Sequence, residues 1–466
     1  MCVHLVQLVF CVKHGYKAMI SPEDTADHTS RNPGPEHVES ITISTSSGQI
    51  HDWFDYKKVT LVRCFNSILP ETILRSSDTL TELTFSEYTL FKNIKRCLKN
   101  LNSLRTLHFT DVIIDAYHRF LYTKIIDVPS LTNLTIRRST KLTNSEYFLL
   151  DFLTRGVNCK TLAKFQLVEG SGLEEGSNLL ALEESAENQE PFEDVYDHDV
   201  VIVARFLMKH HTSLRNVSVS GTHVKVWDSE KTKEHFVQNL KLLKLDSFTY
   251  STTDAGLKLI LCHQKQLKHL HCSTDIGDVE RVQNIYDCVK ECRRTLTSFH
   301  IICKIRERIE NEQGYSFECK HFEHCHNLSS FELTSKALDK DGATNELLNN
   351  NVSSFEVLNV HLLPISLRLL TLTSESFPND SIEKLFEQLP KFEDLETFKL
   401  ETNSPYSFKL SWLQTLCNLP KIQSVTINGA FVDVKQEVDE LIKDSRQGIN
   451  ILFNNNDISC FPSGKR

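Results

Sequence analysis

Residues 80–109 read LTELTFSEYTLFKNIKRCLKNLNSLRTLHF. The same six-residue pattern, apolar-x-x-apolar-x-apolar, opens and closes this stretch, at Leu80-Leu83-Phe85 and at Leu104-Leu107-Phe109. Alternate side chains of an extended segment point to opposite faces, so the second and third apolar residues predict a short strand with one buried face. Between the two patterns, the segment NIKRCL (93–98) predicts a helix whose apolar stripe closes the layer.

The pattern recurs along most of the chain. Its first residues are Leu80, Leu104, Leu131, Leu162, Leu214, Leu240, Leu267, Leu296, Leu328, Phe355, Leu367, Leu395 and Ile422. Their number alone proves little, because on the order of ten matches would arise by chance at this composition. The spacing is informative: the steps are 24, 27 and 31 residues from 80 to 162, then 26, 27, 29, 32 and 27 from 214 to 355, then 28 and 27 from 367 to 422.

A period of this length is typical of leucine-rich repeats. One strand and one helix cannot bury their apolar faces alone, whereas stacked units share a continuous core. We therefore expect an α/β fold, a leucine-rich-repeat solenoid of horseshoe form. Parallel strands would line its concave face and helices its convex face.

Two places break the period. The step from 162 to 214 is 52 residues and contains 169–199, which has eleven Asp or Glu and no Lys or Arg. This composition predicts an acidic, disordered insertion, after which a helix near 200–210 resumes the fold. The step from 355 to 367 is only 12 residues. Either one of these two matches is a chance hit, or the unit is degenerate there.

The pattern also predicts the boundaries of the array. Residues 1–35 are an N-terminal segment and linker, 36–168 the N-terminal repeats, 200–455 the C-terminal repeats, and 456–466 a tail. Weak early units are expected at Val38-Ile41-Ile43 and Tyr56-Val59-Leu61, and a closing strand at 449–453 after a helix over 435–443.

A cysteine stands shortly before the first leucine in three units, NCKTL (158–162), ECRRTL (291–296) and HCHNL (324–328). This arrangement, with its variable unit length, resembles the cysteine-containing repeats of F-box proteins over roughly residues 36–455. In that family an F-box docks the adaptor of a cullin ubiquitin ligase, and the repeats hold the substrate. The resemblance thus implies a substrate receptor or adaptor of an SCF-type ligase.

The N-terminal segment departs from the family pattern, because residues 1–35 contain no complete F-box. Residues 8–20 (LVFCVKHGYKAMI) are faintly similar to its last helix, which would make them a remnant. The segment ILPETIL (68–74) also looks like an F-box opening, but it lies between two strand motifs. An ordinary repeat helix with Pro70 in its first turn is the expected structure there.

Composition indicates an ordinary soluble protein. Of 466 residues 40% are hydrophobic, the net charge is −9, and the 14 cysteines are spread singly, which favours reduced thiols in a cytoplasmic or nuclear protein. Residues 1–20 make a poor signal peptide, and no segment has eighteen uninterrupted apolar residues, so no membrane association is expected.

No catalytic constellation is visible in the sequence. A Gly-rich phosphate loop, a G-x-S-x-G elbow and an H-E-x-x-H motif are all missing, so we expect no enzyme and no cofactor. The richest cluster is Cys319, His321, His324, Cys325 and His326. Cysteine and histidine can ligate zinc, but this spacing matches no standard finger and Cys325 is explained by the repeat, so no metal is expected.

The positions beside the inward residues of each strand predict the binding surface. On the concave face they form a central basic and histidine-rich stripe, with Glu82, Glu332, Glu396 and Glu401 toward the two ends. The stripe consists of Arg105, His108, Arg137, Lys164, Arg215, Lys244, Lys268, His269, His271 and His300. It suggests an acidic segment of a protein partner.

Several interpretations remain open from the sequence. The stripe could instead be solvated without a partner, or it could pair with the acidic insertion of the same molecule. A free-standing scaffold or inhibitor is the alternative to the ligase receptor. A nucleic-acid-associated repeat protein is a lower alternative, because an acidic chain is poorly suited to bind phosphates.

Overall fold

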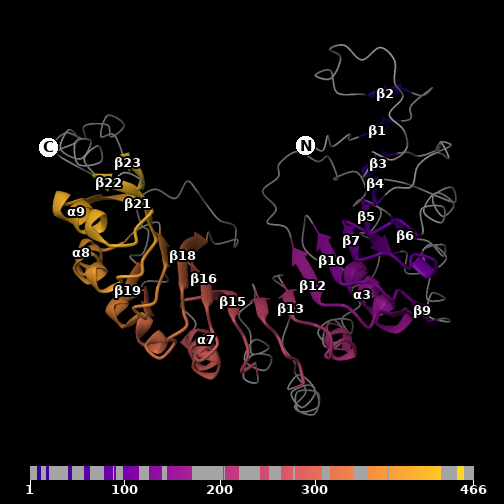
Figure 1. The fold of residues 1–466 in the computed structure, drawn as a ribbon, viewed down its shortest axis with the longest axis horizontal. Helices are drawn as coiled ribbons and strands as arrows, with labels where there is room; N and C mark the ends of the chain where they lie inside the picture. Colours follow the sequence, from indigo (N-terminus) through magenta and orange to yellow (C-terminus); the bar gives the residue numbers. More distant parts are fainter. Residues whose placement is uncertain are drawn as a thin grey trace. The chain divides into compact units, whose positions relative to one another are not determined.

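The computed structural model divides into two units, Met1–Leu245 (unit 1) and Asp246–Arg466 (unit 2) (Figure 1). The structure describes residues 8–11, 17–19, 40–44, 57–62, 78–87, 89–90, 98–114, 125–138, 144–169, 203, 205–219, 242–250, 264–276, 279–306, 315–338, 355–374, 377–431 and 449–455.

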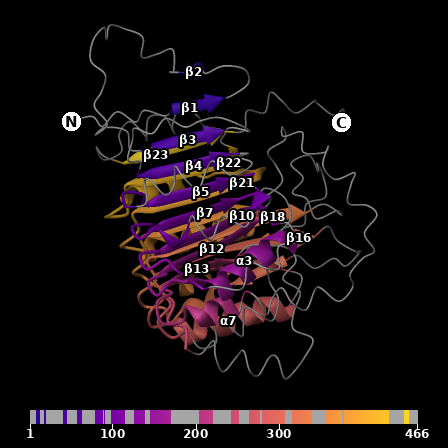
Figure 2. The same ribbon diagram turned by 90° about the vertical axis from the view of Figure 1, so that its right-hand side faces the viewer.

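The described part of unit 1 is built on a main sheet whose strands follow one another nearly in chain order (Figure 2). β2 pairs antiparallel with β1, and from β1 through β3, β4, β5, β7, β10 and β12 to β13 every pairing is parallel. The strands are β1 Leu8–Cys11, β2 Lys17–Met19, β3 Ser40–Ser44, β4 Lys58–Val62, β5 Glu82–Ser86, β7 Thr106–Thr110, β10 Asn133–Arg138, β12 Lys164–Glu169 and β13 Asn216–Val219.

The main strands of unit 2 are paired in the same way. Its strands run parallel in the order β14, β15, β16, β18, β20, β21, β22, β23. They are β14 Ser247–Tyr250, β15 His269–Asp275, β16 Ser298–Arg306, β18 Ser330–Leu338, β20 Leu369–Ser374, β21 Thr397–Ser407, β22 Ser424–Phe431 and β23 Asn450–Asn455.

Consecutive repeats are joined by a backbone contact that recurs at the same position. The carbonyl oxygen of the residue after the first apolar residue of the pattern accepts hydrogen bonds from two N–H groups of the next repeat. Arg105 accepts bonds from Thr132 and Asn133, both at 2.9 Å, and Lys268 accepts bonds from Thr297 and Ser298 at 2.8 and 3.0 Å. A carbonyl oxygen also accepts two N–H groups of the next repeat at Lys57, Thr81, Thr132, Ala163, Asp246, Thr297, Ser329, Arg368 and Glu396. This contact marks the start of each repeat independently of its side chains.

The core lies behind each main sheet and consists of the repeat apolar residues. Leu83, Phe85, Leu107 and Phe109 of unit 1 are 0–3% exposed. In unit 2, Phe299 packs against Phe322 and Phe331, with ring centroids 4.6 and 5.7 Å away. Burying one such side chain contributes about 1.5–3 kcal/mol, so the stacked repeats together supply the continuous core that no single repeat has.

The described helices cover the core side of the sheets (Figure 1). They are α3 Asn144–Gly156, α7 Val279–Cys292, α8 Asn379–Gln388 and α9 Leu410–Asn418, with short 3₁₀ turns η6 Cys319–Phe322, η7 Val360–Leu362 and η8 Leu389–Lys391. α8 shows why such a segment is helical. It starts directly after Pro378, places Asp380 in the first turn, and buries Ile382, Leu385 and Phe386 at helical spacing. The predicted leucine-rich-repeat solenoid is therefore confirmed.

Among the described residues, three two-stranded sheets lie outside the main strands. They pair β6 Thr89–Leu90 with β8 Ile113–Ile114, β9 Ile126–Asp127 with β11 Val157–Asn158, and β17 Tyr315–Glu318 with β19 Phe355–Leu358. The last pair explains the 12-residue step of the sequence pattern. Leu367-Leu370-Leu372 forms the main-sheet strand β20, whereas the match at Phe355 belongs to a small sheet.

The long step from 162 to 214 is an insertion between neighbouring strands, because β12 pairs directly with β13. Residues 203 and 205–209 are helical, as expected for the segment that resumes the fold. Residues 170–202 lie outside the described residues, and so do 68–74, 435–443 and 456–466. The acidic character of 169–199 stays a statement about sequence.

At the N-terminus the helical interpretation is wrong for the residues that the structure describes. Leu8–Cys11 and Lys17–Met19 are strands β1 and β2, and β1 pairs in parallel with β3. The alternation of Leu8, Val9, Phe10 and Cys11 suits a strand that extends the sheet. These strands differ from the helix expected of an F-box remnant. The early units at β3 and β4, and the closing strand β23, are confirmed.

The cysteines that suggested the repeat subtype are buried in the structure. Cys159, Cys292 and Cys325 are 4%, 2% and 0% exposed, and they pack just before the first leucine of their repeats. They are free thiols, as are Cys272, Cys288, Cys303, Cys319 and Cys417. A small apolar thiol suits this crowded position.

Candidate binding surface

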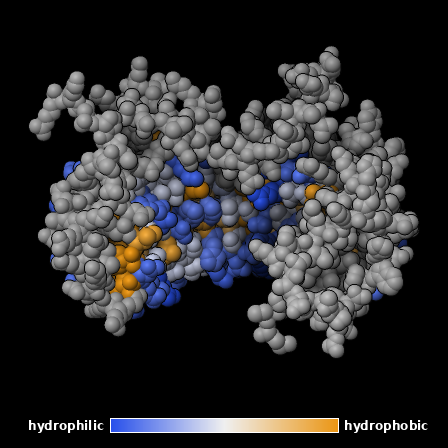
Figure 3. Space-filling model, turned by 90° about the horizontal axis from the view of Figure 1, so that it is seen from above, coloured by the Kyte–Doolittle hydropathy of each residue, from blue (hydrophilic) through white to orange (hydrophobic). Residues whose placement is uncertain are grey.

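Alternate residues of every main strand point away from the core, and together they form a polar surface on each unit. We call it the strand face. In unit 1 its middle row runs through Thr60, Thr84, His108, Thr135, Gln166 and Ser218, which lie opposite one another on paired strands. All of them are half-buried, whereas their sequence neighbours along each strand are buried. The coloured residues visible in Figure 3 are mostly hydrophilic.

Five of the predicted site residues lie on or beside the strand face of unit 1. His108, Arg137 and Lys164 point outward from β7, β10 and β12, and Arg137 and Lys164 are exposed. Arg105 and Arg215 occupy the residue before β7 and before β13, at the N-terminal edge of the sheet. The structure thus brings these five together over four neighbouring strands, β7, β10, β12 and β13.

His108 is neutral in this setting at physiological pH. Its half-buried imidazole has a lowered pKa, chiefly because burial disfavours the charged form. The Glu82 carboxylate acts in the opposite direction, and the Lys164 ammonium lowers the pKa further. The positive charge of this face therefore comes from arginine and lysine, and His108 contributes a neutral hydrogen-bonding group.

The predicted position of Lys244 on a strand is wrong. The frame Leu240-Leu243-Leu245 predicted it there, but the strand is β14, in which Phe248 and Tyr250 are buried. The structural frame is Leu245-Phe248-Tyr250, five residues further on, and Asp246 carries the repeat carbonyl. Both frames satisfy the apolar pattern, which is why the sequence alone did not separate them. Lys244 is exposed in the segment before the strand.

In unit 2 the predicted cation Lys268 is an ion-pair partner within the sheet. It lies just before β15, and its Nζ is 3.1 Å from Oδ1 of Asp246, the equivalent residue of the preceding repeat. The exposed His269 begins β15 and points outward. Because the carboxylate of Asp246 balances its charge, Lys268 attracts an external anion less strongly than an unpaired lysine would.

His271 and His300 are placed directly opposite each other on β15 and β16. Their rings are stacked, with centroids 4.1 Å apart and 15° between the planes. Burial, reinforced by the neighbouring His300, lowers the pKa of His271 to about 4, against the opposite influence of Glu332. Burial and the nearby Lys336 also lower the pKa of His300. Both rings are consequently neutral at pH 7.

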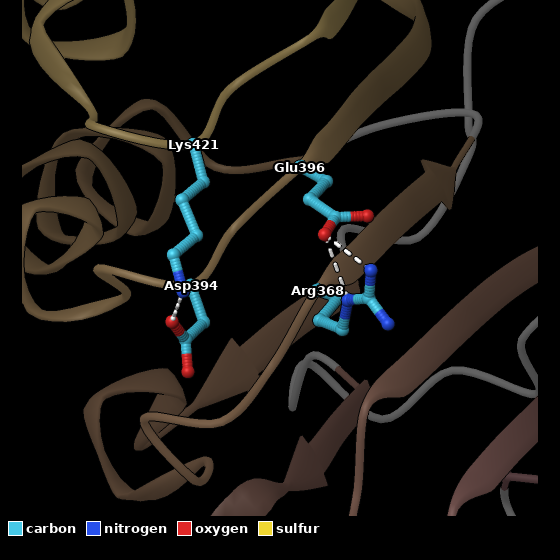
Figure 4. A network of polar contacts seen from close by, with 4 residues as sticks. All are labelled: Arg368, Asp394, Glu396 and Lys421. Carbon is cyan, nitrogen blue, oxygen red and sulfur yellow. Dashed lines mark hydrogen bonds and ion pairs between the residues drawn. The ribbon is translucent and has the colours of Figure 1, made fainter.

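Three of the four acidic residues expected on the face, Glu82, Glu396 and Glu401, are paired with cations. Glu82 lies 3.3 Å from Lys58, and Glu401 lies 2.9 Å from Lys399. Glu401 also accepts a bond from Asn428 at 2.8 Å. Glu396 accepts a bond from Nε of Arg368 at 2.8 Å, beside a second contact between Asp394 and Lys421 (Figure 4). Apart from the Lys399–Glu401 pair, which lies within β21, these contacts join adjacent repeats.

The predicted stripe is thus described as two groups, one in each unit. Arg105, His108, Arg137, Lys164, Arg215 and Lys244 belong to unit 1, and Lys268, His269, His271 and His300 to unit 2. Sequence reasoning missed Arg368 and Lys399 as members of the face. The sequence pattern could have identified both. Arg368 occupies the same repeat position as Arg105, and Lys399 the same position as His300.

The cysteine and histidine cluster of η6 does not converge. Cys319 and Cys325 are fully buried, and the His321 ring stacks on Tyr286 at 3.8 Å. His324 and His326 are exposed. Within the described residues no group of three or more His, Cys, Asp or Glu could hold a metal ion. Packing accounts for the buried members of the cluster.

Unit 1 also contains a buried pair of Cys159 and His210. The Sγ of Cys159 lies 3.8 Å from Nε2 of His210, and both residues are below 5% exposed. Burial raises the pKa of the Cys159 thiol to about 11 and lowers the pKa of His210 to about 4. Both groups are therefore neutral, and the thiol has neither the charge nor the access that a nucleophile needs.

Neither a protein-family model nor a curated protein sequence matches the chain. Among solved structures it is similar to TLR13 in a complex with ssRNA13, at 14% identity and a TM-score of 0.46, over 90% of this chain and 56% of that one. It is also similar to the LRR ectodomain of the plant membrane receptor kinase GASSHO1/SCHENGEN3 from Arabidopsis thaliana in complex with CASPARIAN STRIP INTEGRITY FACTOR 2. That match has 12% identity and a TM-score of 0.30, and it covers 90% of this chain and 53% of that one.

A third similar structure is the plant peptide hormone receptor RGFR1 in complex with RGF2, at 11% identity and a TM-score of 0.27, over 90% of this chain and 67% of that one. The chain spans little more than half the length of the first two. Likeness at this level concerns the fold and carries no argument about partners. Among the described residues, no helix is long and apolar enough to cross a membrane.

Proposed function

We propose that this chain is a protein-binding solenoid that holds its partner on the strand face. The observation that carries the proposal is the alternation along each main strand. Inward residues are buried in the core, while outward residues form aligned polar rows such as His271, His300, Glu332, Thr371 and Lys399. Aligned rows present hydrogen-bonding groups to a ligand at the regular spacing of the strands, about 4.8 Å.

The chemistry of the described residues favours binding over catalysis. His271 and His300 have lowered pKa values through burial, and Glu82 and Glu401 lie in ion pairs with lysines of the same sheet. Cys159, Cys272, Cys288, Cys292, Cys303, Cys319 and Cys325 are buried. These groups stabilise the sheet and its surface. Such a rigid polar surface suits the binding of a protein partner.

The test compares two double variants of the full chain in co-purification from cells. Thr135→Arg with Thr371→Arg places one long cation on the strand face of each unit, where both threonines are half-buried. Gln283→Arg with Gln414→Arg adds the same charge to exposed positions of α7 and α9. We expect a stoichiometric partner to be lost from the first variant and retained by the second. Equal retention by both variants would refute binding on the strand face.

A finer proposal is that the partner is the substrate of an SCF-type ubiquitin ligase, for which this chain is the receptor or adaptor. Its support is the resemblance of the cysteine-containing repeats, in which Cys159, Cys292 and Cys325 precede the first leucine. Co-purification of the full-length protein with a cullin adaptor is the expected result. A partner recovered without that adaptor favours the alternative, a free-standing scaffold or inhibitor.

A further inference from the structure

The strand face of unit 1 contains a group of cations that the sheet itself does not neutralise. We call Arg105, Arg137, Lys164 and Arg215 the cationic surface. They lie on or directly before four neighbouring strands, β7, β10, β12 and β13. Arg105, Arg137 and Lys164 are exposed, and Arg215 is half-buried.

Other cations of the same sheet behave differently. Lys58 pairs with Glu82 at 3.3 Å, and Arg138 lies 3.9 Å from Asp111. By contrast, no carboxylate among the described residues lies within ion-pair distance of the four cations of the surface. The guanidinium of Arg215 donates to the carbonyl oxygen of Leu214, at 2.8 Å. Among the described residues of unit 1, the strand-face cations without an ion pair therefore lie on β7–β13 or directly before these strands.

Neutral polar side chains fill the space between these cations. Asn133 donates to Oγ1 of Thr106 at 3.2 Å, and Thr135 donates to Oε1 of Gln166 at 3.2 Å. These cross-strand bonds hold the side chains in place, and they leave Oδ1 of Asn133 and the amide nitrogen of Gln166 available for an external ligand. The surface thus combines fixed cations with groups that suit a peptide backbone.

The side chains of the surface favour a carboxylate-rich polypeptide over a nucleic acid. Single-stranded nucleic acids are usually held by aromatic side chains that stack on the bases. The outward residues of β5, β7, β10, β12 and β13 include no Phe, Tyr or Trp. They are Glu82, Thr84, Ser86, Thr106, His108, Thr110, Asn133, Thr135, Arg137, Lys164, Gln166, Val168, Asn216 and Ser218. Arginine, in turn, matches a carboxylate with two parallel hydrogen bonds.

We propose that the cationic surface binds an acidic polypeptide segment of a partner protein. The inference rests on the proposed function and names the chemistry of the partner. Neighbouring strands are about 4.8 Å apart, so β7 to β13 spans about 14 Å. An extended segment of about five residues covers this distance, with alternate side chains on one side. A run such as Glu-x-Glu-x-Glu therefore places carboxylates along the row of Arg105, Lys164 and Arg215 at the N-terminal ends of the strands. Arg137 lies four residues further along β10 than the partner of Lys164, where it meets a carboxylate beside this row.

The experiment is fluorescence anisotropy with the full chain and a labelled peptide of alternating Glu and Gly. The test variant is Arg137→Glu with Lys164→Glu. The matched control is Lys290→Glu with Lys384→Glu, which reverses the same number of charges at exposed positions of α7 and α8. We expect the test variant to weaken binding about tenfold or more and the control less than about twofold. Added salt should weaken the wild-type complex.

Two further arms complete the design. The milder variant Arg137→Gln with Lys164→Gln should weaken binding in the same direction, and it replaces the reversal variant if that one fails to fold. A labelled oligothymidylate of equal charge replaces the peptide in a parallel titration. We expect the chain to bind the acidic peptide more tightly than the oligonucleotide.

The chain's own acidic segment is a competing occupant, so a variant that lacks residues 174–199 is titrated as well. If the peptide binds only to this variant, the result still supports binding at the cationic surface. It also indicates that the chain's own acidic segment occupies the surface when no partner is bound. Three results overturn the proposal: no peptide binding by either chain, equal weakening in the test and control variants, or preference for the oligonucleotide. A failed peptide titration with a partner still retained on the strand face would refute only this inference.

Discussion

His271 and His300 face each other on adjacent parallel strands with their rings stacked 4.1 Å apart. Such a pair can be neutral at no electrostatic cost, but two protonated rings at this distance would repel each other. Glu332, on the next strand, lies opposite His300 and acts in the other direction on His271. The stack therefore couples the stability of unit 2 to pH.

The first prediction is that stability falls on mild acidification. The pKa of His271 is about 4 in the folded chain, below the ordinary value of 6.5. A histidine whose folded pKa is lowered binds fewer protons when folded than when unfolded. Its contribution is thus complete above pH 6.5 and is lost as the pH falls from 6.5 toward 4. Urea denaturation at pH 7.5 and pH 5 measures the loss.

The variant His300→Gln should lessen this pH dependence, because it removes the second positive charge from the stack. Thr334→Val, on the neighbouring strand face, is the non-titrating control and should keep the wild-type dependence. The buried His210 of unit 1 also has a pKa of about 4, so some dependence of stability on pH remains in both variants. Identical slopes for wild type and His300→Gln would contradict the assignment to the stack.

A second prediction concerns Gly429, which lies in β22 with a φ of +82°. A Cβ atom there would lie 2.0 Å from the carbonyl oxygen of Thr402 on the neighbouring strand. Gly429→Ala combines an unfavourable backbone conformation with a clash against backbone, so we expect a loss of more than about 2 kcal/mol in unfolding free energy. Ser424→Ala, on the same strand, should change it by less than about 0.5 kcal/mol. A tolerated alanine would show that β21 and β22 approach less closely there.

A third prediction uses the buried thiols. Burial raises the pKa of Cys159 to about 11, and burial with the neighbouring Cys325 raises that of Cys292 to about 12. Iodoacetamide reacts with the thiolate, so both should be modified at least about tenfold more slowly than the half-buried Cys417 in the native chain. Peptide mass spectrometry after timed labelling reports each site. Fast native labelling of Cys292 would contradict its place in the core.

A fourth prediction tests the aromatic core of unit 2. Phe299 is fully buried against Phe322 and Phe331. Phe299→Ala should lower the unfolding free energy by about 3–5 kcal/mol, since it removes a large buried side chain and leaves a cavity. Ser298→Ala, half-buried at the start of the same strand, should cost less than about 0.5 kcal/mol. Similar losses for both would place the core elsewhere.

Much of the fold was predictable because burial follows the sequence alternation. At Leu296-Phe299-Ile301 the three apolar residues are buried where the pattern predicts. The pattern failed at Leu240, because Leu245-Phe248-Tyr250 satisfies it equally well and only the pairing of β14 with β15 separates the two frames. It also failed to separate Phe355 from Leu367, since a strand of a small sheet buries apolar residues as a main strand does.

The site was less predictable than the fold. Which residues point outward follows from alternation, and Arg137 and Lys164 were identified in this way. Whether a cation is neutralised depends on the register between repeats, which the sequence pattern does not specify. Lys268 and Arg368 look as available as Arg105 in sequence, yet they pair with Asp246 and Glu396. The histidine stack likewise required the register of β15 and β16.

Site-specific photo-crosslinking tests the central claim, that a protein partner is bound on the strand face. A benzophenone amino acid replaces Arg137 or His269, which are exposed on the strand faces of units 1 and 2, or Lys290 or Glu387, which are exposed on α7 and α8. Irradiation in cells, followed by purification under denaturing conditions, retains only covalent partners. We predict a crosslinked protein from the strand-face positions and none from the helical positions. Crosslinks from the helical positions alone would contradict the account.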